Sequence, residues 1–187
     1  EELRRVMPVI EGLVAAGTGA QISIDTSKAP VAEAAVRVGA TLVNDVTALR
    51  GDPRIAELVA AHGTEVCLMH MLGEPRTMQD DPRYDDVVSA VKAFLEARMA
   101  FAIAEGIAEE RILLDPGIGF GKTLEHNLEL VRRLDELAAL GRPVVVGVSR
   151  KSFLGRITGR DVHDRVAATV AVNVLAFERG ASVFRVH

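Results

Sequence analysis

The feature that most limits the fold of this sequence is a repeated switch between two hydrophobic periods. Short apolar runs that alternate every second residue, as strands do, are followed by longer stretches with apolar residues at helical spacing. The six predicted strands are residues 20–27, 41–46, 65–71, 112–115, 144–149 and 182–187. Helices are predicted over residues 3–14, after Pro30, after Asp52-Pro53, and over residues 87–99, 123–140 and 162–177. The pattern predicts an α/β protein in which five helices connect six strands and one further helix leads.

Strands separated by helices are expected to be parallel, because a parallel pair needs a long crossover connection. Two architectures meet this requirement: an open doubly wound sheet and a (β/α)8 TIM barrel. Doubly wound sheets usually carry a phosphate-binding fingerprint after the first strand, and the residues after Asp25 contain none. A barrel instead gathers functional residues at the C-terminal ends of many strands. We therefore predict a TIM barrel.

The whole chain, residues 1–187, is predicted to be one domain. A complete barrel takes roughly 250 residues, so this chain is expected to hold six of the eight strands. The first two strands are expected before Glu1, and the last helix after His187.

Composition excludes several classes of protein. Hydrophobic residues make up 49% of the chain and charged residues 26%, which is typical of a folded domain with a substantial core. The net charge is −4, and no run of Lys or Arg is long enough to follow a nucleic-acid backbone. The single Cys67 cannot form a disulfide within the chain, and no apolar stretch has the length of a membrane span. We predict a cytoplasmic protein that binds neither nucleic acid nor membrane.

One glycine-rich stretch, residues 112–127 (ILLDPGIGFGKTLEHN), joins a predicted strand to a predicted helix. It is similar to a phosphate-binding loop, but such a loop needs a glycine where this chain has Pro116. Asp115 at the end of the strand would also repel a bound phosphate. The stretch is therefore predicted to face a ligand that donates hydrogen bonds.

The last inward-facing residue is polar on nearly every predicted strand, since alternate side chains share a face. These residues are Asp25, Asn44, Asp115, Ser149, Arg185 and His187, and Lys151 follows shortly after Ser149. Simpler interpretations stay open for single residues. Asp25 could cap a helix, Asn44 could form an Asx turn with Asp45, Arg185 could pair with Asp115, and Lys151 could be solvated. Stability alone does not explain the whole set, because unpaired buried polar groups are costly. A ligand site at one mouth of the barrel is predicted.

Six stretches resemble the successive signatures of the dihydropteroate synthase family: IDTSK, LVNDV, LMHMLGEPRTMQ, LDPGIGFGK, GVSRKSFLG and RVH. They occur in the family's order and cover nearly the whole chain. The resemblance implies a TIM barrel and an activity in folate synthesis that sulfonamides inhibit. The family joins 6-hydroxymethyl-7,8-dihydropterin diphosphate to p-aminobenzoate and releases diphosphate and 7,8-dihydropteroate.

The resemblance implies a role for each matching residue. The pterin-binding residues would be Asp25, Asn44, Met69, Asp115, Phe120, Lys151 and Arg185. Asp115 would accept the paired N–H donors of the pterin ring. Arg185 and His187 would bind the diphosphate, and Ser152 would lie at the p-aminobenzoate site. Lys151, Arg185 and His187 would be the catalytic residues.

The resemblance further implies a Mg²⁺ ion on the diphosphate and a homodimer formed through barrel helices. The family's magnesium ligand, an asparagine, lies on the first strand, so no metal ligand is assigned within this chain. Two rivals stay open: a methyltetrahydrofolate-dependent corrinoid methyltransferase and a non-catalytic pterin-binding module. Arg185 and His187 favour the synthase over the methyltransferase, because methyl transfer has no use for a diphosphate clamp.

Overall fold

The computed structural model describes all residues, Glu1–His187, and contains eight α-helices, two short 3₁₀ helices and six strands. The chain divides into two compact units. The first unit comprises Glu1–Met69 and Ala97–Leu113, and the second comprises His70–Glu96 and Leu114–His187. No helix combines the length and the apolar character that crossing a bilayer requires.

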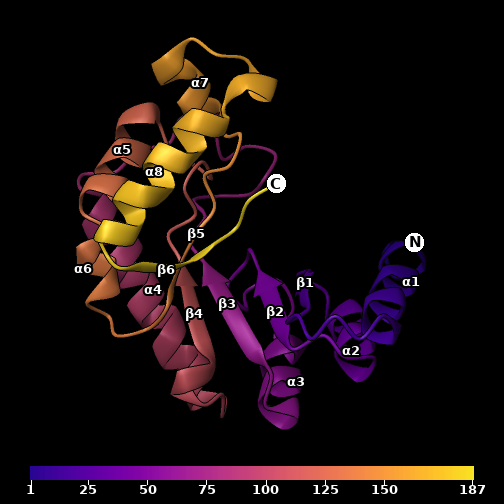
Figure 1. Ribbon diagram of the computed structural model, residues 1–187. Helices are drawn as coiled ribbons and strands as arrows, with labels where there is room; N and C mark the ends of the chain where they lie inside the picture. Colours follow the sequence, from indigo (N-terminus) through magenta and orange to yellow (C-terminus); the bar gives the residue numbers. More distant parts are fainter. The chain divides into compact units, whose positions relative to one another are not determined.

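Three parallel strands run through the first unit: β1 (Ser23–Asp25), β2 (Leu42–Asp45) and β3 (Glu65–Met69). They alternate with the helices α1 (Glu2–Ala15), α2 (Ala29–Arg37) and α3 (Arg54–His62). Figure 1 shows the three strands side by side, with α2 and α3 next to them. The register places Asp25 opposite Asn44 and Asn44 opposite Cys67, so the polar ends of β1 and β2 lie at the same edge.

The helices of the first unit follow from local sequence signals. Pro30 lies in the first turn of α2, where its missing N–H costs nothing. The left-handed Gly63 ends α3. The apolar residues Ile55 and Val59 of α3 are completely buried, as is Val43 of β2. The helical spacing thus places one apolar stripe of α3 in the core.

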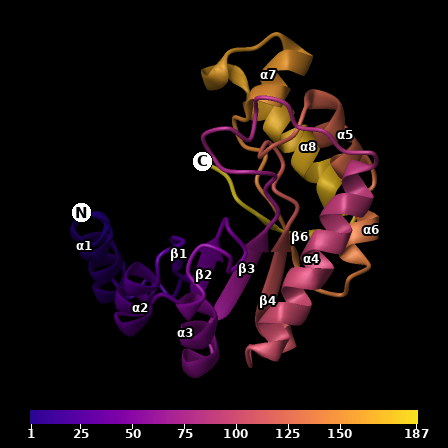
Figure 2. The same ribbon diagram turned by 180° about the vertical axis from the view of Figure 1, so that it is seen from behind.

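The second unit contains β5 (Val144–Val146) and β6 (Ala181–Phe184), while β4 (Ile112–Asp115) runs across the division between the units. Leu114 pairs with Val144, and Val144 pairs with Ala181, so these strands are also parallel. The other elements of this unit are α5 (Leu124–Arg132), α6 (Asp135–Ala138), α7 (Ser152–Thr158), η2 (Val162–Asp164) and α8 (Val166–Glu178). The helix α4 (Val87–Ala104) is divided between the two units, and η1 (Glu109–Arg111) belongs to the first. Seen from behind in Figure 2, α5, α6 and α8 lie together on one side of the second unit.

All six predicted strands are present, but the prediction of one continuous helix over residues 123–140 is wrong. Residues 123–140 instead form α5 and α6, because Arg133 leaves the helical conformation (φ −112°, ψ 31°). The Arg133 guanidinium donates to Asp86 (2.7 Å) and Glu136 (2.6 Å). The helix predicted over residues 162–177 likewise starts as the 3₁₀ turn η2, in which Asp161 accepts from the His163 amide.

Candidate active site

The glycine loop, defined here as residues 116–121, follows β4 in the second unit. Gly117, Gly119 and Gly121 all have positive φ, at 65°, 84° and 59°. The even spacing of these glycines therefore reflects a backbone that enters the left-handed region at every second residue, which favours glycine. Two residues after the loop, Thr123 caps α5 by accepting from the His126 amide.

Asp115 and Arg185 form the centre of the polar cluster in the second unit. The Asp115 carboxylate is buried at the end of β4, with 1% exposure. Its Oδ1 accepts from the Gly117 amide (2.7 Å), and its Oδ2 accepts from Arg185 Nη2 (2.8 Å). The Arg185 guanidinium lies against Gly147, where a Cβ would come within 2.8 Å of Nη2. The ion pair between Arg185 and Asp115, which the sequence left as one possibility, is therefore present. The Arg185 side chain is 41% exposed.

Lys151, which precedes α7, is the second cation of this cluster. Its ammonium donates to the Ile118 carbonyl and lies 4.5 Å from the centre of the Phe120 ring. Burial lowers the pKa of Lys151 to about 8; Asp115 opposes this shift and Arg185 adds to it. Lys151 is therefore half-buried and bonded to the glycine loop rather than merely solvated.

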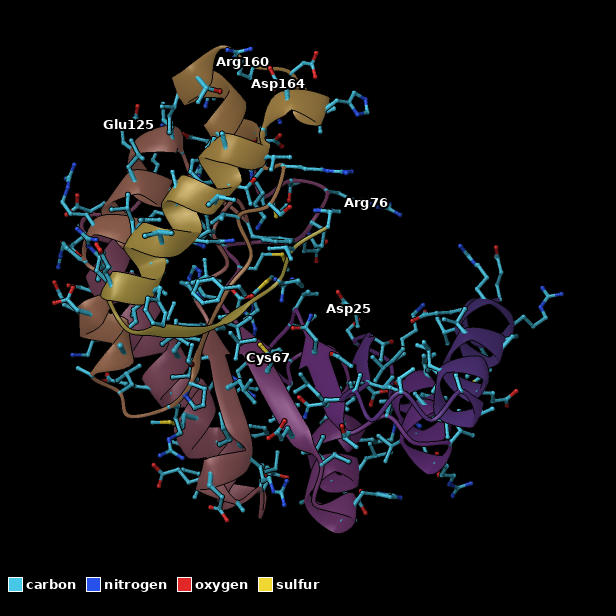
Figure 3. The ribbon with its side chains drawn as sticks, in the orientation of Figure 1. Asp25, Cys67, Arg76, Glu125, Arg160 and Asp164 are labelled. Carbon is cyan, nitrogen blue, oxygen red and sulfur yellow. The ribbon has the colours of Figure 1, made fainter.

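His187 and Ser152 lie at the edge of the second unit. His187 Nδ1 is 2.9 Å from Ser149 Oγ, which also accepts from the His187 amide. Ser152 opens α7 and is exposed. It borders a cavity of about 630 Å³ that is otherwise lined by Gly155, Arg156, Gly159, Arg160, Asp161 and Arg165. Figure 3 shows Arg160 at this end of the unit, beside its ion-pair partner Asp164.

The remaining predicted site residues belong to the first unit. Asp25 is exposed at the end of β1, as Figure 3 shows, while Asn44 and Met69 are buried. The simpler interpretations fare differently. The Asx turn considered for Asn44-Asp45 is present at Asp45, whose carboxylate accepts from the Thr47 and Leu49 amides. The first amide of α2 donates to Asp52 rather than to Asp25.

Sequence reasoning missed one buried cation, Lys122, which directly follows the glycine loop. Its side chain is 4% exposed and lies 2.9 Å from His70 Nδ1. Burial lowers the pKa of Lys122 to about 7; Asp115 opposes the shift and Lys151 adds to it. No periodicity in the sequence distinguishes this inward lysine from a lysine that faces a ligand.

A comparison of the sequence with family models identifies the chain's relatives. The model of the family described as "Pterin binding enzyme" matches residues 1–187. The chain belongs to the pterin-binding enzyme family. Within this family, it is 43% identical over 187 residues to the dihydropteroate synthase of Escherichia coli (strain K12). The alignment covers the whole of this chain and 66% of that relative, so the chain spans slightly less than two thirds of the relative's length.

Solved structures of pterin-binding enzymes are also similar to this chain. Dihydropteroate synthase from Thermus thermophilus in complex with 4-aminobenzoate is 49% identical, with a TM-score of 0.94 that covers 100% of this chain and 72% of that one. The same enzyme in complex with 6HMPPP is 48% identical, with a TM-score of 0.93, and the match covers 100% and 73% of the two chains. The predicted class, an α/β fold of the TIM-barrel type of which this chain is a part, is confirmed.

Proposed function

We propose that the chain carries the pterin and diphosphate contacts of a dihydropteroate synthase. The reaction would join 6-hydroxymethyl-7,8-dihydropterin diphosphate to p-aminobenzoate and release diphosphate. The observation that carries the proposal is the buried Asp115 carboxylate at the end of a parallel strand, which pairs with Arg185 and acts electrostatically on Lys151. Similarity to synthases solved with 6HMPPP and with 4-aminobenzoate supports the same substrates for this chain.

In this proposal Asp115 accepts the two adjacent N–H donors of the pterin ring. A carboxylate matches such a flat pair of donors in a two-pronged geometry. Arg185 Nη2 donates to Asp115 Oδ2, and the Gly117 amide donates to Oδ1. When the pterin binds at Asp115, Arg185 Nη2 would give up this bond. The partly exposed guanidinium can then turn onto the pterin face and toward the diphosphate.

The other contacts follow from the chemistry of each group. The Lys151 ammonium is suited to the carbonyl oxygen of the pterin, and the Phe120 ring beside it is suited to an apolar wall. Asn44 offers both a donor and an acceptor, Asp25 a further carboxylate, and Met69 apolar surface. We place the diphosphate at Arg185 and His187, and p-aminobenzoate near Ser152 and its arginine-lined cavity.

The proposed reaction forms a C–N bond from the arylamine nitrogen to the pterin methylene carbon and breaks the C–O bond to the diphosphate. The arylamine is neutral and nucleophilic near pH 7, so no strong base is required. The barrier lies at the departing anion, whose charge would be stabilised by the Arg185 guanidinium and by hydrogen bonding from His187. Catalysis would therefore come from positioning and charge complementarity, with the arylamine proton leaving to solvent.

The residues of this chain do not by themselves fit a Mg²⁺ ion. No group of three or more His, Cys, Asp or Glu side chains is arranged to hold a metal. The one buried carboxylate of the cluster is already engaged by Arg185 and the Gly117 amide. We therefore derive no step through magnesium from these residues.

Three further expectations stay predictions: one domain over residues 1–187, a cytoplasmic location and a homodimer. Sedimentation velocity of the complete protein measures the last of these directly.

The assay for the proposed function uses the complete protein with both substrates. Diphosphate release that depends on p-aminobenzoate, together with formation of 7,8-dihydropteroate, is the expected result. A parallel incubation with methyltetrahydrofolate and a reduced corrinoid measures methyl transfer. Methyl transfer without diphosphate release would show that the protein is a methyltransferase and not a synthase. Pterin binding without either reaction would indicate a binding module.

The pH dependence of pterin binding should report Lys151. Its pKa is lowered to about 8, so the ammonium is present below this pH and is lost as the pH rises through it. We therefore expect the KM for the pterin diphosphate to increase above about pH 8. The charges that face Lys151 and act on its pKa are those of Asp115 and Arg185. The Lys151→Met variant should have a higher KM at low pH and should lose the increase in KM around pH 8. If Lys151→Met keeps this increase, a group other than Lys151 causes it.

A further inference from the structure

The glycine loop is held by side chains along its whole length. Five consecutive carbonyls, those of residues 117–121, each accept a hydrogen bond from a side chain. The donors are Lys122 to Gly117 (3.0 Å) and Phe120 (2.9 Å), Lys151 to Ile118, Gln79 to Gly119 (2.6 Å), and Tyr84 to Gly121 (2.8 Å). Such a loop is fixed before any ligand binds, because almost no backbone acceptor is left to reorganise.

Lys122 makes more of these bonds than any other side chain. Its buried ammonium has three protons and three acceptors: the Gly117 carbonyl, the Phe120 carbonyl and His70 Nδ1 at 2.9 Å. His70 is itself held edge-on against Phe94, with ring centres 4.9 Å apart. A buried charge is tolerated where all its donors are satisfied, and Lys122 meets this condition.

The direction of Lys122 separates this loop from a phosphate-binding loop. In a phosphate-binding loop, the lysine after the last glycine reaches out to the phosphates. Here the ammonium turns back and bonds two carbonyls of its own loop. Although the sequence context is similar, Lys122 therefore stabilises the shape of its own loop instead of pointing toward a phosphate.

We propose that Lys122 is a positioning residue for pterin binding, whose ammonium fixes the glycine loop so that Asp115 and Lys151 face the ligand in one geometry. Gly117 links Lys122 to Asp115, because its carbonyl accepts from Lys122 and its amide donates to Asp115 Oδ1. Lys151 bonds the next carbonyl along the loop and lies over the Phe120 ring. The inference rests on the proposed function, since it assigns the positioned groups to a pterin.

Protonation of Lys122 is part of this positioning. Its pKa lies at about 7. The charged or titratable groups that face it are His70 after β3, Asp115 at the end of β4 and Lys151 before α7. When Lys122 deprotonates, the neutral amine has two protons instead of three and loses the charge that strengthens its bonds to the Gly117 and Phe120 carbonyls. The loop should therefore loosen as the pH rises through this range.

The variant Lys122→Met in the complete protein tests the proposal, because methionine keeps much of the volume and removes every donor. We expect the KM for the pterin diphosphate to rise at least about tenfold, with the KM for p-aminobenzoate within about threefold of wild type. Lys92→Met on α4 is the control, since Lys92 donates none of the hydrogen bonds that hold the loop carbonyls, and both KM values should stay unchanged. A purely structural role would lower the yield of folded enzyme and leave the pterin KM of the folded fraction unaltered.

The outcomes separate this inference from the proposed function. A wild-type protein that releases no diphosphate overturns the function, whereas an active wild type with an unchanged pterin KM in Lys122→Met overturns the positioning role. If Lys122→Met does not fold, hydrogen exchange of the wild-type Gly119 and Phe120 amides decides. These amides donate to Asn127 and Gly117. Their protection, corrected for intrinsic exchange, should fall as the pH crosses the pKa of Lys122. Constant protection contradicts the proposal.

Discussion

Asp115→Asn is expected to weaken pterin binding by about 1.5–3 kcal/mol, or roughly 10- to 150-fold in Kd. Asparagine keeps the shape but replaces one acceptor oxygen by an NH₂ group, which then faces a donor of the ligand. The loss is large because Asp115 is buried, so water cannot substitute for the missing acceptor. Equilibrium titration with the pterin diphosphate measures the effect, and urea unfolding of the same samples measures stability separately.

Asp164→Asn is a matched control for Asp115→Asn. Asp164 also pairs with an arginine, Arg160 at 2.6 Å, but both side chains are about two thirds exposed. Exposed pairs contribute about 0–1 kcal/mol, so pterin affinity should remain as in wild type.

Arg185→Ala should show a different pattern from Asp115→Asn, with turnover reduced more than pterin affinity. An Asp115→Asn protein with wild-type pterin affinity would show that Asp115 does not bind the pterin.

Gly121→Ala is expected to destabilise the protein by about 2–4 kcal/mol, which combines left-handed strain of about 1 kcal/mol with an overpacking cost of about 1–3 kcal/mol. Gly121 has a φ of 59°, which L-residues rarely adopt. An added Cβ would also lie 2.9 Å from the carbonyl oxygen of Leu72. Backbone atoms cannot move aside as the end of a flexible side chain can, so the glycine loop or the Leu72 segment must shift. Urea unfolding monitored by circular dichroism measures the loss.

Gly141→Ala separates strain from collision. Gly141 lies in the same unit and also has positive φ (77°), but a Cβ there would meet nothing within 4 Å. We expect only the strain, about 1 kcal/mol. Equal losses at Gly141 and Gly121 would mean that the Leu72 contact does not constrain the loop. A larger loss of stability in Gly121→Ala, accompanied by a raised pterin KM, would show that the close approach of Gly121 to Leu72 maintains the geometry of the site.

Much of the candidate site follows from strand periodicity. Asp115 and Arg185 were selected because each follows an apolar run at the position where a parallel strand ends, and the structure shows them bonded to each other. That pairing was left open, because the sequence separates the two residues by 70 positions. Lys151 lies beyond the strand that contains Ser149 in the sequence prediction, and its partial burial and its bond to Ile118 depend on a loop that is distant in sequence.

Other features could not be read from local patterns. The break between α5 and α6 depends on Arg133, whose guanidinium binds Asp86 from a distant segment. Asp45 and Asn44 are adjacent and both polar, and only the path of the chain after β2 makes Asp45 the turn residue. Propensity describes the preference of a residue averaged over environments, and tertiary contacts of this kind override it.

The sequence by itself determined the order of strands and helices, the parallel α/β class and the positions at which polar groups follow the strands. These properties depend on hydrophobic period and chain connectivity, which are local. Only the tertiary structure decided which way Lys122 points and which acceptor each cation takes. Three acceptors for one ammonium come from Gly117, Phe120 and His70. The cost of burying that charge is offset only when all three meet in space, and no local pattern records whether they do.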